Sequence, residues 1–309
     1  MNALDIVNKH NYNEELSDFI IRVYPILVDY FKDEETVYNA LMSCPIVISD
    51  SVYTAFKEYN FLESMDKNSM VKPETLKIAN GAYESKPYIS YDKEKKTYKV
   101  DKIDRIVAIK KAPLDDEITI GTLVHEICHL IKSYSKEYEI SYDVLKQRCG
   151  FIEKLYHINS KDGIINKELI VGGETGVGLE EGFNELAEEE ITSRLIGKEY
   201  ESKGYNIMKQ YVNELLKIKI PYLKEALLEV QVTHDNTRIN QILGDLFYKM
   251  IENTDKIYPL EVDMLNFLFS TKIKKAREVS ERINEIIDNE TNPIIFEGLR
   301  NIEKGTMNL

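Results

Sequence analysis

The sequence predicts an α+β protein in which helix predominates and a small, mostly antiparallel sheet occupies the middle of the chain. Near both ends, apolar residues recur at spacings of three and four, the periodicity of an amphipathic helix. In the middle, residues 87–111 and 149–173 are rich in Tyr, Ile and Val with partial alternation, which favours strands. We therefore expect a helical N-terminal region (residues 1–80), a core of strands and helices (81–200) and a helical C-terminal region (201–309).

The N-terminal region is predicted to be helical from residue 13 to about residue 58. Its first apolar positions with helical spacing are Leu16, Phe19, Ile20, Val23 and Leu27. Pro25 lies within this pattern, and we expect a kink or a boundary there because proline lacks the amide N–H of a helical residue. The Asn80-Gly81 pair then predicts a turn.

The core is expected to contain two sets of strands. Residues 87–92 and 97–100 flank a polar turn and predict a hairpin, which residues 103–111 follow as a further strand. Residues 149–159 and 163–173 flank a turn at 160–163 and predict a second hairpin. A glycine-rich stretch leads into an acidic helix, and the pattern from Tyr205 onward is helical, with weak breaks at Pro221, Asp235-Asn236, Pro259 and Pro293.

Another helix is predicted between the two sets of strands. Pro113 and the acidic residues 115–117 favour a helix start, since proline fits the first turn and carboxylates favour the positive end of the helix dipole. The apolar stripe that follows, at spacings of three and four, consists of Ile120, Leu123, Val124, Ile127, Leu130 and Ile131.

This helix carries the motif HExxH, as His125, Glu126 and His129. Four residues are slightly more than one helical turn, so both imidazoles project from one face and can bind one metal ion. Two imidazoles and one further ligand hold zinc with an open position for water, and Glu126 can take a proton from that water. A chance match in this chain is roughly a one-in-a-hundred event, so the surrounding sequence has to decide.

The acidic helix offers the third ligand. Glu181 and Glu185 stand four apart and share one helical face, so Glu181 can complete the ligand set while Glu185 accepts the free N–H of a ligand histidine. The neighbouring carboxylates Glu180, Glu188 and Glu189 remain alternatives to Glu181. A solvated acidic face is the simpler interpretation of the whole run.

Residues 180–185, EEGFNE, together with HExxH, resemble the motifs of the gluzincin metallopeptidases, which include thermolysin and the zinc aminopeptidases. Their second motif is similar to NExxxD or NEGxxE, and Glu180 stands here where Asn is common. The resemblance covers residues 88–195 and implies a zincin-like core with one Zn²⁺ per chain on His125, His129 and Glu181. It also implies that Glu126 is the general base and that Glu185 supports a ligand. The chain departs from thermolysin in the gap of about fifty residues between His129 and Glu181.

The family also uses a downstream His or Tyr to stabilise the oxyanion of the tetrahedral intermediate. His234 is the remaining histidine after the site, and it is our candidate for this catalytic role. Three tyrosines compete with it, namely Tyr205, Tyr211 and Tyr222. A turn or helix-cap role beside Asp235 and Asn236 is the simpler interpretation of His234.

Composition narrows the class of protein further. A hydrophobic content of 43% over 309 residues suffices for a proper core, and a net charge of −13 with interleaved basic residues argues against nucleic-acid binding. The three cysteines, Cys44, Cys128 and Cys149, predict neither a disulfide framework nor a zinc ribbon. Without an apparent signal peptide or membrane-spanning stretch, the chain is expected to be cytoplasmic, and its oligomeric state is left open.

Three functions are compatible with this sequence. The first is a zinc metallopeptidase that hydrolyses a peptide or protein substrate with a metal-activated water and a glutamate base. The second is a regulatory or toxin-like protein whose zinc-binding core acts on one specific protein partner. The third is a non-catalytic helical scaffold in which the motif is accidental.

Overall fold

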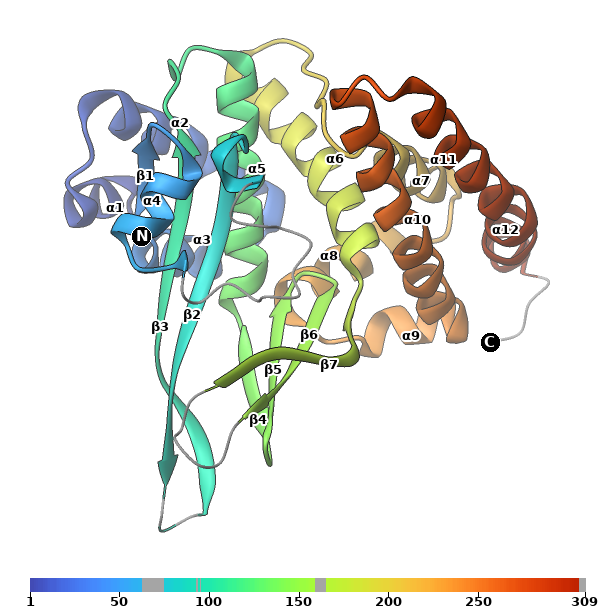
Figure 1. Ribbon diagram of the computed structural model, residues 1–309, viewed down its shortest axis with the longest axis horizontal. Coiled ribbons are helices and arrows are strands. Elements are labelled where there is room, and N and C mark those ends of the chain that lie inside the picture. Colours follow the sequence, from blue (N-terminus) through green and yellow to red (C-terminus); the bar gives the residue numbers. More distant parts are fainter. Residues whose placement is uncertain (63–74, 93, 95, 159–164, 306–309) are drawn as a thin grey trace. The chain divides into compact units, whose positions relative to one another are not determined.

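The computed structural model describes residues 1–62, 75–92, 94, 96–158 and 165–305, and it confirms a predominantly helical α+β protein with two small sheets (Figure 1). The backbone forms two compact units. The first consists of Met1–Glu174 and Ala187–Ser202, and the second of Thr175–Leu186 and Lys203–Leu309. Helix α6 (Val177–Ile196) is continuous and contributes residues to both units.

The described part of the N-terminal region contains four α-helices rather than one long helical run. They are α1 (Ala3–His10), α2 (Glu14–Phe31), α3 (Glu34–Ser43) and α4 (Val52–Glu58). A side-chain cap begins each of them: for example, the Asn13 side chain accepts the Leu16 N–H in α2, and Asp33 accepts the Thr36 N–H in α3. Pro25 lies inside α2 and does not end it.

A short strand within this region was wrongly predicted to be helical. β1 (Ile46–Ser49) follows Pro45 and pairs in parallel with β3, with Ile46 opposite Val107. The run of β-branched residues at 46–48 fits a pleated strand better than a helix, and proline ends the preceding helix. β1 is the one parallel partner in a sheet that is otherwise antiparallel.

The first sheet has the order β1-β3-β2, with β2 (Gly81–Asp92) and β3 (Thr97–Lys110) side by side over most of their length (Figure 1). The sequence predicted two separate strands where β3 is continuous, because residues 101 and 102 are polar but adopt no turn. A register shift at Tyr88/Ile89 absorbs the irregularity instead. Residues 106–109 of β3 are all buried, which explains their continuous apolar run.

Helix α5 (Glu117–Tyr134) carries the HExxH motif and packs against β2 and β3. The helix starts within the predicted acidic run, whereas Pro113 lies before the helix and not in its first turn. Asp116 is the cap: its carboxylate accepts the Thr119 N–H and hydroxyl at 2.8 Å. The predicted apolar stripe, from Ile120 to Ile131, is buried. This packing fixes which face of α5 is left for the histidines.

The second sheet has four strands in the order β4-β5-β6-β7. They are β4 (Tyr138–Ser141), β5 (Val144–Cys149), β6 (Ile152–Ile158) and β7 (Ile165–Thr175). The hairpin of β4 and β5 was not predicted, since its two-residue turn uses Tyr142 with φ 56° in place of the usual glycine or asparagine. The turn predicted at 160–163 lies outside the described residues.

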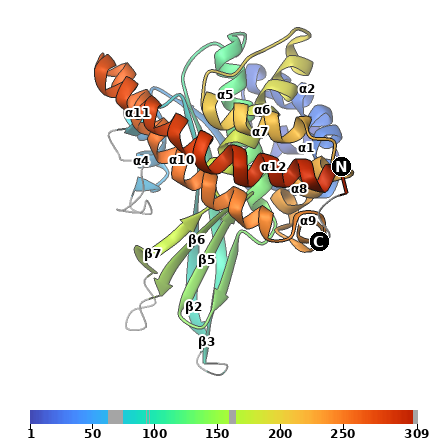
Figure 2. The ribbon, with the colours of Figure 1, turned by 90° about the vertical axis from the view of Figure 1, so that its right-hand side faces the viewer.

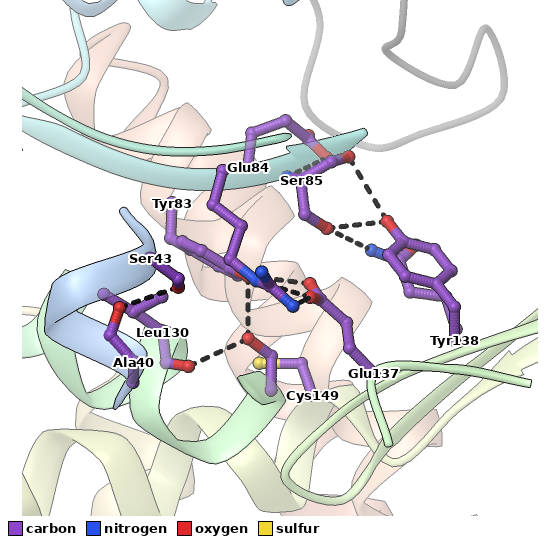
Figure 3. Close-up of polar contacts among 12 residues, drawn as sticks. Ala40, Ser43, Tyr83, Glu84, Ser85, Leu130, Glu137, Tyr138 and Cys149 are labelled. Atoms are coloured by element: carbon purple, nitrogen blue, oxygen red, sulfur yellow. Dashed lines mark hydrogen bonds and ion pairs between the residues drawn. The ribbon is translucent and has the colours of Figure 1, made fainter. Parts of the chain in front are cut away.

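A buried polar network joins β2, β3 and the end of α5 to the second sheet (Figure 3). Glu137 is its centre: its carboxylate accepts hydrogen bonds from Arg105 at 2.8 Å and from the Tyr83 hydroxyl at 2.7 Å. The Ser133 hydroxyl donates to Tyr83 at 2.7 Å, which links α5 to β2. Because Arg105 and Glu137 are both buried, neither charge has water as an alternative partner.

The second unit consists of helices. After the first half of α6 come α7 (Asn206–Lys217), α8 (Leu223–Thr233), α9 (Thr237–Leu243), α10 (Asp245–Phe269), α11 (Ile273–Ile286), a π-helical stretch (Ile287–Phe296) and α12 (Glu297–Glu303). α10 and α11 lie side by side (Figure 2). Two predicted breaks, at Pro221 and Asp235-Asn236, separate helices, whereas Pro259 lies inside α10 and Pro293 inside the π-helical stretch. None of the described helices combines the length and apolar composition needed to cross a membrane.

Glu261 of α10 caps the N-terminus of α7. Its carboxylate accepts the backbone N–H groups of Ile207 at 2.7 Å and Met208 at 3.1 Å. The pKa of Glu261 is raised from 4.5 to about 7, chiefly by burial and in smaller part by the negative charges of Glu185 and Glu181, while the two N–H groups oppose the shift. Ionised Glu261 therefore stabilises α7 locally but is held in an unfavourable environment.

Replacing Glu137 by Ala should lower the free energy of unfolding by about 3–5 kcal/mol, because it leaves the Arg105 charge buried and unpaired. Urea unfolding followed by circular dichroism measures this loss. Glu139→Ala is the matched control: Glu139 is an exposed partner of Arg148, so its loss should cost about 0–1 kcal/mol. Equal effects of the two substitutions would show that the Glu137 network does not stabilise the fold.

Metal-free protein should lose stability through Glu261 as the pH rises from about 4.5 to about 7. Since the pKa of Glu261 is higher in the folded than in the unfolded chain, the folded state binds more protons in this window, and ionisation disfavours it. Thermal unfolding in chelator from pH 4.5 to 8 should show wild type losing stability relative to Glu261→Gln. Glu252→Gln, at an exposed position of the same helix, should leave the pH dependence as in wild type. A constant difference between wild type and Glu261→Gln would contradict the assigned shift.

Candidate metal centre

His125 and His129 lie one turn apart on α5, as the motif predicted. Their ring centroids are 4.9 Å apart with an interplanar angle of 72°. The His125 side chain is 12% exposed and His129 is 9% exposed, so both rings lie largely within the protein. Cys128 is fully buried, as expected of a packed residue rather than a ligand.

Glu188 of α6 contacts the Nδ1 nitrogen of His125. The distance from His125 Nδ1 to Glu188 Oε2 is 3.0 Å. We predicted a contact of this kind for Glu185 with one of the two histidines, and that role of Glu185 stays a prediction. The sequence pattern contained Glu188 only as one of several carboxylates in an acidic run, and spacing alone did not distinguish it.

Cys149, at the end of β5, lies beside the Nδ1 nitrogen of His129. Its Sγ atom is 3.6 Å from His129 Nδ1 and 3.4 Å from the His129 carbonyl oxygen. A thiol that donates to the carbonyl can accept the ring N–H through sulfur. Sequence reasoning missed this contact, because the β4-β5 hairpin that delivers Cys149 was not predicted.

These contacts determine which nitrogen of each ring could bind a metal. A carboxylate cannot donate a hydrogen bond, so in the neutral His125 ring the proton belongs on Nδ1 and the lone pair on Nε2. The Cys149 geometry favours the same tautomer for His129. Metal-binding histidines in proteins are held in this way, with the other ring nitrogen hydrogen-bonded to an outer partner.

Three of the alternative third ligands have other partners in the structure. Gln231 donates to Glu180 at 2.9 Å, and the backbone N–H of Ser202 donates to Glu189 at 3.0 Å. Glu188 is engaged with His125 and with the Tyr200 hydroxyl. These contacts show that the three carboxylates have distinct surroundings on α6.

Glu181 lies two turns before Glu188 in α6, so the continuous helix presents both carboxylates from the same face. His125, His129 and Glu181 are one group of three side chains whose donor atoms are of the kind that could hold a metal ion. A second group of three shares His125 and takes Glu185 and Glu188 in place of His129 and Glu181. The first group is the better candidate for zinc, since it has two imidazoles.

Glu126, the predicted general base, lies where α5 approaches the first residue of β2. A Cβ atom added to Gly81 would lie 3.0 Å from Glu126 Cγ and 2.6 Å from Thr122 Cγ2. The absence of a side chain at Gly81 therefore lets the strand run close to the helix beside Glu126. Glu126 is partly exposed, as a group that exchanges protons with water has to be.

His234 follows α8 in the left-handed conformation, with φ 57°, and its N–H donates to Val230 O at 2.8 Å. This is the backbone geometry expected of a helix-cap residue, and the catalytic role of His234 stays a prediction.

Among the competing tyrosines, Tyr205 caps α7, Tyr211 is buried against Phe296, and Tyr222 is 67% exposed. Burial raises the pKa of Tyr211, which disfavours its ionisation.

Two oriented imidazoles and a carboxylate are a donor set that zinc accepts with one coordination position left open. The chain matches no protein-family model, no curated protein and no solved structure. Its function is therefore inferred from the side chains of α5 and α6 and from the contacts that orient them.

Proposed function

We propose that this protein is a zinc-dependent metallopeptidase with a zincin-like core. The observation that supports it most is the common orientation of His125 and His129, whose Nδ1 atoms contact Glu188 and Cys149. An accidental HExxH on a helix surface has no reason to have both imidazoles held by outer partners. The small sheet against α5 and the acidic helix α6 support the same assignment.

His125, His129 and Glu181 would hold the metal through two nitrogens and one carboxylate oxygen. Zinc bound there would supply Lewis acidity and make a water acidic enough to be deprotonated near neutral pH. The protein's own part is to keep the two rings in one tautomer and to leave room for water and substrate. Glu188 and Cys149 perform the first task.

Glu126 is the general base in this proposal. Its carboxylate takes a proton from the attacking water and later delivers it to the leaving amine, so one residue serves both halves of peptide hydrolysis. His234 is the proposed donor to the oxyanion that forms on the peptide carbonyl. The substrate is a peptide or protein segment.

Purified protein should contain close to one zinc ion per chain, and Glu126→Gln should keep that zinc while hydrolysis falls about 10²–10⁴-fold. The amide retains the size of the side chain but cannot take the proton. Elemental analysis measures the zinc, and release of fluorescent peptides from a labelled, unfolded protein measures hydrolysis.

Glu117→Gln, at the start of the same helix, is the matched control and should retain activity. Absence of zinc from wild type would reject the proposal. Cleavage that survives Glu126→Gln would reject the assigned base. Zinc at one per chain without cleavage of the unfolded protein would favour action on one specific partner.

Glu181→Gln should weaken zinc binding by roughly 100-fold or more, because it removes a charged ligand atom. Competition with a chelator of known affinity measures the change. Glu190→Gln, at an exposed position of α6, should bind zinc as wild type does. If Glu185→Gln has the large effect and Glu181→Gln has none, the third ligand is Glu185.

A further inference from the structure

The segment after α6 folds back against that helix and delivers a tyrosine to Glu188. The backbone N–H of Tyr200 donates to Ser193 Oγ at 2.9 Å, and Ser202 donates to Glu189 through its N–H at 3.0 Å and its hydroxyl at 3.2 Å. These contacts hold both ends of the short segment 200–202 on one face of α6.

Within this segment, the Tyr200 hydroxyl donates to Glu188 Oε1 at 2.7 Å. The other oxygen of the same carboxylate, Oε2, is 3.0 Å from His125 Nδ1. Tyr200 is 9% exposed and Glu188 is 6% exposed, so this chain of contacts is largely shielded from water. A buried hydrogen bond to a carboxylate is stronger than one between neutral groups, and it restricts rotation of the carboxylate.

Gly121 of α5 leaves the room that the contact between Tyr200 and Glu188 needs. A Cβ atom at Gly121 would lie 2.1 Å from the Tyr200 hydroxyl oxygen and 2.6 Å from Glu188 Oε1. Both distances are too short for any side chain, although alanine normally favours a helix over glycine. Gly121 is one turn before His125, so the gap it leaves is directly beside the ring that Glu188 contacts.

The geometry points to Tyr200 as a positioning residue for His125, acting through Glu188 in a space that Gly121 keeps open. With one oxygen fixed by Tyr200, the carboxylate presents the other to Nδ1 and keeps the lone pair on Nε2. The inference rests on the proposed function for its catalytic meaning, but the orientation of His125 is testable without metal.

Tyr200→Phe removes only the hydroxyl and should lower zinc affinity about tenfold in chelator competition, because a hydrogen bond to a charged group is lost. Glu188→Gln should lower it about 10–100-fold. In metal-free protein, ¹⁵N NMR of the neutral His125 ring should show more of the Nε2-protonated tautomer in Tyr200→Phe than in wild type. Gly121→Ala should shift both measurements in the same direction.

Tyr138→Phe is the matched control, since it removes a hydroxyl that is hydrogen-bonded to Ser85 at 2.6 Å in the same unit and away from His125. It should change neither the tautomer nor zinc affinity. If wild type binds no zinc, the proposed function fails, and the tautomer comparison still decides the role of Tyr200. A Tyr200→Phe protein that folds, judged by circular dichroism, and keeps the wild-type tautomer would overturn the inference.

Discussion

The hydrogen bond between Glu188 and His125 is the contact on which the candidate site depends. An imidazole has two nitrogens, and a metal site needs the lone pair on the one that faces the metal. Glu188 selects that nitrogen, because its carboxylate accepts the Nδ1 proton. Without this contact, HExxH would still place two rings on one face of α5, but their tautomers and orientations would be free to vary.

The carboxylates of α6 have distinct environments despite their closeness in sequence. Glu180 accepts from Gln231, Glu188 contacts His125 and Tyr200, and Glu189 accepts from Ser202. Successive residues of a helix are turned by about 100°, so neighbours in sequence face different surroundings. An acidic run that looks uniform in the sequence is therefore divided among several tasks, one of which is support of the proposed ligand set.

The sequence predicted the elements with strong periodicity and missed those set by tertiary contacts. The start and apolar stripe of α5 follow from local preferences that the structure confirms. β1 was missed because its stability comes from pairing with Val107 and its neighbours, about sixty positions away. Spacing identified His125 and His129, since one helix positions both. Glu188 and Cys149 reach those rings from other elements, and a spacing rule cannot rank such distant partners.

The position of β2 along α5 is fixed at two points, and this bears on the general base. At Gly81 the strand lies against the turn that carries Glu126. Two residues later, the Tyr83 hydroxyl accepts from Ser133 of α5 and donates to Glu137, whose charge is balanced by Arg105. A strand held at one point could slide or rotate, whereas the contacts at Gly81 and Tyr83 together fix the position of β2 along α5. Because β2 is an edge strand of its sheet, this register also determines which backbone groups lie nearest Glu126. The buried network around Glu137 therefore contributes to the site through the placement of β2, although none of its residues is a proposed ligand.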